Sequence, residues 1–576
     1  MGGEKTKKIR PRSYLAAARI ILLLIVLGGL AVRIWGIDFG LPQRFHPDEP
    51  VVVTRAIYGV ASDEPDKWNP KAFHWPSMQI YLLGLEYEIL FRIEKFKGTV
   101  DNRDPDFASF SLYYPGIFYY MGRVTTAIFG IGCIYLIYLI ALPLIGMRGA
   151  IIASALGAIH PILIRHSRFI TPDIPSEFFF LGSLFCMNEA LRHTGEIDPD
   201  RDAKFHFKYL VAASIFIGLG TGTKYPVGFL FPALALLILF VRRTEPIVTK
   251  IMRIVILGVV ALAAFLITTP YASLDFPTFI NDIRTIGWHV KTGHIGMEAK
   301  GGIWIASIAQ LLKDSGWVFT VGGFFGFLGF IFEKWKTRWV TLAAFLVVMG
   351  GLAPLDVFSD RYLVPVIPFM CIGAAWLIRK LNNVFRLDDF SMKAGAMSMV
   401  LLILFAWTGI AASIADGIRL NMLDTRTAAL EWVLDNIPNN SKVLVEQGGP
   451  NLNDSNLAPL VPEPYYQITD ITPLFFLGGP DKEPIVEMAE ARPEWIITSS
   501  TVKDRYMRPA AREQYPELVY SFEQYYALIE GYMDEMAGFS SGEGMTGPQL
   551  VIYKVPEGLW DRVRIESVDA EEALGN

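Results

Sequence analysis

The chain has 576 residues, of which 52% are apolar or aromatic and only 19% carry a charge. The mean hydropathy is +0.35, and the charged residues gather between long uncharged stretches. This pattern excludes an ordinary soluble protein and indicates a chain that crosses a membrane many times.

The net charge of −5 hides two parts of opposite character. From Asn421 onward there are 26 acidic and 11 basic residues, so residues 1–420 are basic as well as apolar. We therefore predict a membrane part, residues 1–420, and a water-soluble domain, residues 421–576. Neither part has the stripe of Lys and Arg with interleaved aromatic residues that a nucleic-acid reader needs, so no nucleic-acid partner is expected.

A helix needs about 20 apolar residues to cross roughly 30 Å of hydrocarbon. About eleven stretches satisfy this requirement or approach it. They cover approximately residues 14–36, 114–144, 149–165, 174–191, 209–223, 226–241, 252–269, 303–332, 338–355, 361–378 and 394–416. The predicted fold class is therefore a polytopic α-helical membrane protein.

The basic loops set the orientation of these spans. If the N-terminus is cytoplasmic, the loops that contain Arg148, Arg192 to Lys208, Arg242 to Arg253, Lys334 to Arg338 and Arg379 to Lys393 are cytoplasmic too. This agrees with the positive-inside rule, and the first span reads as a retained anchor in a cell membrane. The soluble domain and the outer loops 37–113 and 270–301 then lie on the extracytoplasmic side.

Two segments of the outer loops are amphipathic, Met78 to Lys97 and Phe276 to Val290, and the first is expected to lie along the membrane surface. The soluble domain is predicted to be α/β. Residues 425–436 have helical spacing, and 442–446, 494–498 and 549–555 are short apolar strands. The last dozen residues are acidic and are expected to be disordered.

The first candidate site motif is His46-Pro47-Asp48-Glu49-Pro50, just beyond the first span. A carboxylate in a partly dehydrated cleft could act as a general base toward a hydroxyl. The alternative is that Asp48 and Glu49 only complement the dipole of a helix that starts there.

Further polar residues follow at the ends of spans. His74 could serve a phosphate or a metal, or be a surface histidine. Arg165, Arg168 and Asp173 flank two apolar runs, where ionic groups are functional candidates unless the arginines snorkel and the aspartate caps a helix. Lys224 is a lysine on the outer side, where the positive-inside rule disfavours one.

Arg361 and Tyr362 begin the tenth span, and Tyr225 follows Lys224. Guanidinium groups can engage phosphate with two hydrogen bonds. Each of these residues, taken alone, could be a solvated loop residue. Their common placement on one face suits an enzyme that handles a lipid phosphate.

The order of these motifs resembles the GT-C glycosyltransferases, and within them the branch of protein O-mannosyltransferases and aminoarabinose transferases, family 39 and its relatives. The likeness spans roughly residues 10–420. It is carried by His46 to Pro50, by Trp75 to Tyr81, by Gly122 to Ala127, by Ser167-Arg168 with Pro172-Asp173, by Thr223 to Tyr225 and by Arg361 to Pro365.

The resemblance implies transfer of a sugar from a polyprenyl-phosphate donor to an acceptor glycan, lipid or protein on the outer side, usually with inversion. It places catalytic carboxylates at Asp48, Glu49 and Asp173, with Asp48 as the base. Cationic residues, aided by a divalent metal if one is used, would stabilise the departing lipid phosphate.

Aminoarabinose transferases have Glu-Lys-Pro-Pro where this chain has His74-Trp75-Pro76-Ser77. That difference leaves the role of His74 open, as well as any metal site at this position. His289 and His294 are the candidate metal ligands.

Two other functions remain open at this stage. A transporter or flippase of lipid-linked saccharides could use the same cleft for binding alone. Transporters usually show paired repeats and ionisable residues near the bilayer midplane, whereas here no repeat is evident and the polar groups cluster at one face. The spans could also anchor a working soluble domain, but eleven are more than an anchor requires.

Overall fold

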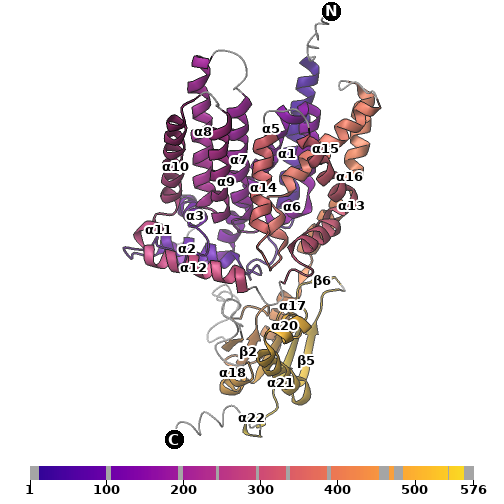
Figure 1. The fold of residues 1–576 in the computed structure, drawn as a ribbon. Coiled ribbons are helices and arrows are strands. Elements are labelled where there is room, and N and C mark those ends of the chain that lie inside the picture. Colours follow the sequence, from indigo (N-terminus) through magenta and orange to yellow (C-terminus); the bar gives the residue numbers. More distant parts are fainter. Residues whose placement is uncertain are drawn as a thin grey trace, which may run out of the picture.

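The computed structural model describes residues 12–98, 106–192, 199–241, 245–292, 298–332, 338–385, 391–452, 466–471, 484–542 and 544–562. A bundle of long helices forms one end of the molecule, and a smaller domain with a sheet forms the other (Figure 1). The predicted class, a helical membrane protein with a C-terminal α/β domain, is confirmed. The acidic last dozen residues lie outside the described ranges.

The predicted spans are all helical in the structure. The helices that correspond to them are α1 (Arg12–Ile34), α5 (Pro115–Ile159), α6 (Pro161–His166), α7 (Asp173–Arg192), α8 (Pro199–Thr221), α9 (Leu230–Val241), α10 (Ile247–Thr268), α13 (Ile303–Ile331), α14 (Arg338–Leu352), α15 (Ile367–Val384) and α16 (Met392–Leu420). Within the described residues, five of them (α1, α5, α10, α13 and α16) are long and apolar enough to cross a membrane by themselves.

Two of the long helices are broken at glycine. Gly146, with a φ of 73°, divides α5, and Gly316, with a φ of 75°, divides α13. Glycine adopts this conformation without the steric cost that a side chain would add. The break at Gly146 falls between the second and third predicted spans, whereas the break at Gly316 was not predicted.

Small residues let α13 and α15 approach closely. A Cβ added at Gly326 would lie 2.2 Å from the carbonyl oxygen of Gly373, and one added at Gly373 would lie 2.2 Å from that of Gly323. Such backbone contact is typical of helix pairs in membranes, because dispersion contacts there replace the hydrophobic effect. These two helices form a tight pair in the bundle.

Short helices cover one end of the bundle, the end that faces the sheet domain (Figure 1). They are α2 (Glu49–Ala61), α3 (Met78–Lys97), α4 (Phe107–Tyr113), α11 (Tyr271–Leu274) and α12 (Phe276–Thr292), with the 3₁₀ turns η1 (Tyr225–Phe229) and η2 (Asp360–Leu363). The segment predicted as amphipathic, residues 78–97, forms the helix α3, and its placement along the membrane surface stays a prediction. The described part of α1 begins at the opposite end.

The C-terminal domain has a five-stranded sheet with the order β3-β2-β4-β7-β5. Strands β2 (Lys442–Glu446), β3 (Gln467–Ile471) and β4 (Trp495–Ser499) are parallel, and β7 (Leu550–Lys554) and β5 (Asp534–Phe539) are antiparallel to their neighbours. The short strands β1 (Leu423–Asp424) and β6 (Met545–Thr546) pair separately. Helices complete the domain: α17 (Thr425–Asn436), α18 (Pro484–Ala491), α19 (Ser500–Tyr506), α20 (Pro509–Gln514), α21 (Pro516–Tyr532) and α22 (Leu559–Arg562).

The helix predicted at 425–436 and the three predicted strands are therefore confirmed, with shifts of one residue. Strands β3 and β5 were not predicted.

Candidate functional site

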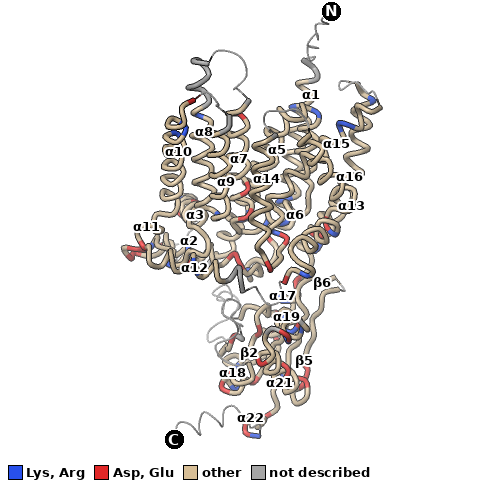
Figure 2. Tube along the Cα trace, viewed as in Figure 1, with Lys and Arg blue, Asp and Glu red and all other residues tan. Residues whose placement is uncertain are grey.

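The site lies at the end of the bundle that faces the C-terminal domain. Charged residues of both signs occur near α6 and α13 (Figure 2), and some of them, such as Asp173 and Asp314, are buried. They come from loops and helix ends that are distant in the sequence. Their contacts show which of the predicted residues meet.

Asp48 occupies the N-cap position of α2, where Pro50 in the first turn favours the start of a helix. Its side chain accepts no capping hydrogen bond from that helix. Instead, Nη1 of Arg361 donates to Oδ2 of Asp48 at 2.7 Å. The two side chains are 31% and 28% exposed, so this ion pair is open to a ligand.

A second ion pair lies next to the first. Nζ of Lys224, just before η1, donates to Oδ1 of Asp173, the first residue of α7, at 2.6 Å. The Asp173 side chain is buried, while that of Lys224 is 27% exposed.

The ring of Tyr362 joins the two ion pairs. Its centroid lies 6.0 Å from Nζ of Lys224 and 5.9 Å from the guanidinium carbon of Arg361. Arg361 also lies within the electrostatic reach of Asp173. Residues 48, 173, 224, 361 and 362 therefore form one cluster, as the sequence predicted.

Arg165 lies in an adjoining group of charges. Its guanidinium donates to Asp416 at 2.7 Å, to Asp314 at 3.2 Å and to Asp360. The sequence predicted Arg165 as a phosphate ligand, but in this structure three carboxylates already surround it. Nε2 of His166 lies 3.1 Å from the other oxygen of Asp360, the residue before Arg361.

Sequence reasoning missed Asp314, Asp360, Asp416 and His166 as site residues. Asp314 lies in α13 and Asp416 in α16, both long apolar helices. An ionisable residue inside such a helix is itself a signal of function, and it would have identified these two aspartates.

Arg168 is buried inside the bundle. Its Nη2 donates to the carbonyl oxygen of Val32 at 2.6 Å. Its Nε and Nη1 have no hydrogen-bond partner among the described residues. Its one hydrogen bond to a described residue goes to the backbone and none to the Asp48 and Arg361 pair, and its predicted role as a phosphate ligand stays a prediction.

Glu49, next to Asp48, is fully buried. Its two carboxylate oxygens accept hydrogen bonds from Nε and Nη2 of Arg123 at 2.8 and 2.7 Å, and one of them also accepts from the backbone N–H of Ile170. Both side chains of this ion pair have no exposed surface. This sealed ion pair favours a positioning role for Glu49, and the catalytic role that the sequence suggested stays a prediction.

His46 belongs to the first candidate motif, but the sequence analysis gave it no role of its own. Its ring lies 4.3 Å from that of Phe169, and its Nδ1 accepts a hydrogen bond of 3.3 Å from the backbone N–H of Asp48. Burial lowers the pKa of His46, although the nearby carboxylates of Glu49 and Asp48 oppose this shift. The neutral ring that results can accept the Asp48 N–H and orient that loop.

His74 is exposed, in the loop between α2 and α3. The adjacent Phe73 is fixed by two contacts: its carbonyl oxygen accepts from the Tyr225 hydroxyl at 2.8 Å, and its N–H donates to Asp282. Tyr225, predicted as a substrate ligand, therefore holds the loop that carries His74.

The side chains of both candidate metal ligands lie outside the part of the chain that the structure describes. The side chain of His289, in α12, is not described, and His294 lies outside the described residues. In the described part of the chain, no group of three or more His, Cys, Asp or Glu side chains is placed to hold a metal ion. The three cysteines are free and buried.

Comparisons with known proteins agree with this arrangement. Residues 101–279 match the family model described as dolichyl-phosphate-mannose-protein mannosyltransferase. No curated protein is a significant match to the chain.

Several solved structures share the fold. ArnT from Cupriavidus metallidurans in the apo state has a TM-score of 0.54 and 13% identity, over 93% of this chain and 98% of that chain. The same protein bound to undecaprenyl phosphate has a TM-score of 0.51 and 13% identity, over 92% and 97%.

The archaeal oligosaccharyltransferase AglB from Archaeoglobus fulgidus, in complex with an inhibitory peptide and a dolichol-phosphate, has a TM-score of 0.53 and 14% identity, over 96% and 76%. Identities this low show the fold alone, and that fold is the GT-C fold. Together with the family match, it identifies a glycosyltransferase, as the sequence resemblance predicted.

Proposed function

We propose that this protein transfers a sugar from a polyprenyl-phosphate donor to an acceptor hydroxyl on the extracytoplasmic side of the cell membrane, with inversion at the anomeric carbon. The observation that carries the proposal is the meeting of Asp48, Asp173, Lys224 and Arg361 in one cluster. Solved structures of the same fold hold undecaprenyl phosphate and dolichol-phosphate. The N-terminus would be cytoplasmic and the C-terminal domain extracytoplasmic.

In this mechanism Asp48 is the base. The acceptor oxygen attacks the anomeric carbon and forms the new glycosidic bond, while the bond from that carbon to the phosphate oxygen breaks. The acceptor proton passes to the Asp48 carboxylate, and the lipid phosphate leaves with the electron pair of the broken bond. A positioned base of this kind contributes about 10² to 10⁴ in rate.

The cations would serve the leaving group. Arg361 and Lys224 are each about a quarter exposed and each holds one carboxylate. A donor phosphate that engages Arg361 would compete with Asp48 for the guanidinium, so donor binding would release Asp48 to accept a proton. Fixed cations at the departing phosphate stabilise the charge that develops there.

The support for a divalent metal in the reaction is weaker. An Archaeoglobus fulgidus oligosaccharyltransferase structure of this fold contains zinc, but the described residues of this chain do not converge as a ligand set. We therefore assign no step of the reaction to a metal.

The test is turnover of a polyprenyl-phosphate sugar by the full-length protein in lipid nanodiscs, with released lipid phosphate as the readout. Asp48→Asn should lower the rate by about 10² to 10⁴ while the protein folds normally. The control is Glu94→Gln, a change of the same kind in the exposed ion pair with Lys97. Undiminished turnover by Asp48→Asn would overturn the base assignment.

The same assay separates transfer from transport. A flippase would move the lipid-linked sugar without releasing lipid phosphate. The configuration of the product, measured by the anomeric NMR coupling, tests inversion.

A further inference from the structure

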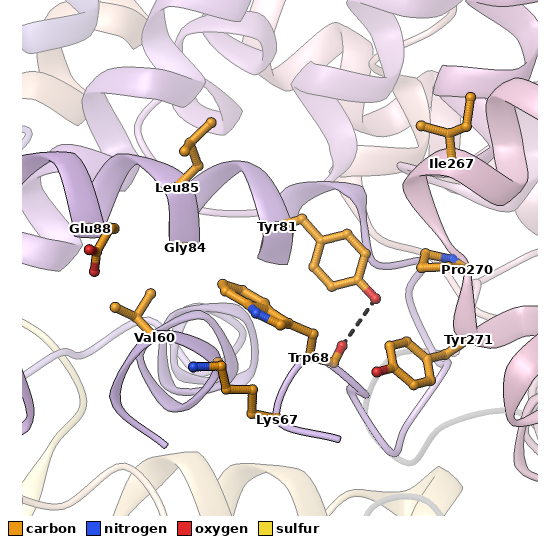
Figure 3. Close-up of a pocket in the computed structure, with 11 residues that line it drawn as sticks. Val60, Lys67, Trp68, Tyr81, Gly84, Leu85, Glu88, Ile267, Pro270 and Tyr271 are labelled. Carbon is orange, nitrogen blue, oxygen red and sulfur yellow. Dashed lines mark hydrogen bonds between the residues drawn. The ribbon is translucent and has the colours of Figure 1, made fainter. Parts of the chain in front are cut away.

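A cavity of about 570 Å³ lies at the end of the bundle that faces the sheet domain, and none of its lining residues belongs to the charged cluster. It is bounded by α2, α3, the loop between them, and the junction of α10 with α11 (Figure 3). Its lining residues are Gly59, Val60, Lys67, Trp68, Tyr81, Gly84, Leu85, Glu88, Ile267, Pro270 and Tyr271.

The cavity has an apolar end and a cationic end. Leu85 and Ile267, which are 59% and 77% exposed, lie on one side of α3, and Lys67 lies on the other (Figure 3). Ile267 belongs to α10, a helix long and apolar enough to span the membrane. We therefore expect its exposed side chain to face lipid and the Lys67 side of α3 to face water.

Aromatic side chains line the cavity between these ends. The Trp68 indole fits between two helices at glycines, because a Cβ at Gly59 or Gly84 would lie 2.6 or 2.7 Å from ring atoms. The Tyr81 ring packs edge-on against it at 5.9 Å, and the Tyr81 hydroxyl donates to the Trp68 carbonyl oxygen. Trp and Tyr rings are enriched where a membrane meets water, since they have an apolar body and a polar atom.

A second cavity of about 380 Å³ adjoins the first, and Lys67 and Trp68 line both. It adds Arg55 and Lys71 to the lining. Lys71 is paired with Asp66, whereas Lys67 makes no side-chain ion pair within the described ranges. The water side of the two cavities thus presents an available ammonium group and a half-buried guanidinium. The Glu88 carboxylate, which also lines the first cavity on this side, is paired with Arg92.

We propose that these joined cavities bind an anionic membrane phospholipid, at a site separate from the donor site. The phosphate would lie at Lys67 and Arg55, and the acyl chains would run past Trp68 toward Leu85 and Ile267. Charge complementarity and the lipid-facing apolar end favour this occupant over a soluble anion. The assignment is independent of the proposed glycosyl transfer.

A lipid bound at this site would influence the reaction through the helix α2. Val60 lies near the C-terminal end of α2 and Asp48 caps its N-terminal end, so about 18 Å of helix separates them. A lipid that fixes one end of α2 also limits the motion of the Asp48 end.

The experiment is native mass spectrometry of the full-length protein in mild detergent, titrated with phosphatidylglycerol. Lys67→Glu should weaken binding of the retained lipid by at least about five-fold, because a lysine near an anionic surface contributes about that factor. The matched control is Lys97→Glu, the same charge reversal at the exposed end of α3, which should bind as the wild type does.

Three outcomes would overturn the proposal. They are equal lipid retention by Lys67→Glu and the wild type, equal retention of phosphatidylcholine and phosphatidylglycerol, and displacement of the lipid by inorganic phosphate at matched concentration. The last outcome would indicate a site for a soluble anion. If Lys67→Glu fails to fold, Lys67→Gln, which keeps most of the aliphatic side chain, provides the same comparison. The expected loss of lipid affinity is then smaller.

Discussion

Asp48 and Glu49 are neighbours in the sequence, yet they occupy opposite environments. The Asp48 side chain is 31% exposed and pairs with Arg361 at the end of the bundle. Glu49 pairs with Arg123 in the interior, and neither side chain of that pair has exposed surface. Successive helical residues point about 100° apart, so the start of α2 sends one carboxylate outward and the other inward. The comparison shows that the exposure of an ion pair matters more than its charge. A carboxylate in an exposed pair can exchange its partner for a substrate group, whereas one in a buried pair stabilises the fold.

The largest expected effect follows from breaking the sealed pair. Glu49→Gln leaves the buried Arg123 without its carboxylate, which should destabilise the protein by about 3–5 kcal/mol. Thermal unfolding of the purified full-length protein measures this loss. Glu94→Gln, which breaks an exposed pair, should shift stability by no more than about 1 kcal/mol. A Glu49→Gln protein that unfolds like the wild type but is inactive would show that Glu49 takes part in the chemistry.

Glu446 extends the comparison to a buried carboxylate that has no ion pair in the described structure. It ends β2 and accepts a hydrogen bond of 2.6 Å from the N–H of Ser499, and burial raises its pKa to about 7 from 4.5. The folded domain then holds a proton that the unfolded chain releases. Stability of the domain should therefore fall as the pH rises from about 4.5 to about 7, by an amount on the order of 3 kcal/mol, and level off above that.

Thermal unfolding of the full-length protein across pH 5 to 8 tests this expectation. Glu446→Gln, which cannot ionise, should flatten the pH dependence of the transition that reports on the sheet domain. An unchanged slope in that variant would mean that another group titrates.

The half-exposed pair of Arg361 and Asp48 should respond to mutation in activity without losing the fold. Arg361→Gln removes a charged hydrogen-bond donor to the proposed phosphate, a contact of about 1.5–3 kcal/mol. We expect about a 10- to 150-fold loss in kcat/KM for the lipid-linked donor and little change in unfolding temperature. Lys95→Gln, on α3, is the matched control. Large destabilisation by Arg361→Gln would make this pair structural, like Glu49 and Arg123.

The smallest effect concerns the contact between the C-terminal domain and the Asp48 loop. The Arg426 guanidinium lies 3.8 Å from the centroid of the Phe45 ring and donates to the Phe45 carbonyl oxygen at 3.2 Å. Loss of such a cation–π contact is worth about 0.5–1 kcal/mol, so Arg426→Leu should slow turnover about two- to five-fold. Arg492→Leu, in an exposed pair of the same domain, should leave the rate unchanged, and equal rates for both variants would remove Arg426 from the positioning of Asp48.

The sequence predicted the helices well because apolar length is a local property. The same holds for β2, β4 and β7, whose buried residues lie in short apolar runs. The 3₁₀ turn at Asp360–Leu363 delays α15 until Ile367, six residues after the predicted start, and the kink at Gly316 was also missed. Both features depend on contacts with other helices, which no local window contains.

The site was predictable in part for the same reason. A polar residue at the end of an apolar run is visible in the sequence, so Asp48, Asp173, Lys224 and Arg361 could be selected. Which partner each would take was not visible. Arg165 meets Asp314 and Asp416 across 149 and 251 residues, and only the packing of α6 against α13 and α16 brings them together.

The glycine contact between α13 and α15 fixes the support of the Arg361 turn. The backbones touch at Gly323, Gly326 and Gly373, beyond the break at Gly316, and α15 follows the turn that carries Arg361. A cation carried by a rigid helix pair loses little freedom when it binds a phosphate, so this side of the site would be pre-organised for the donor.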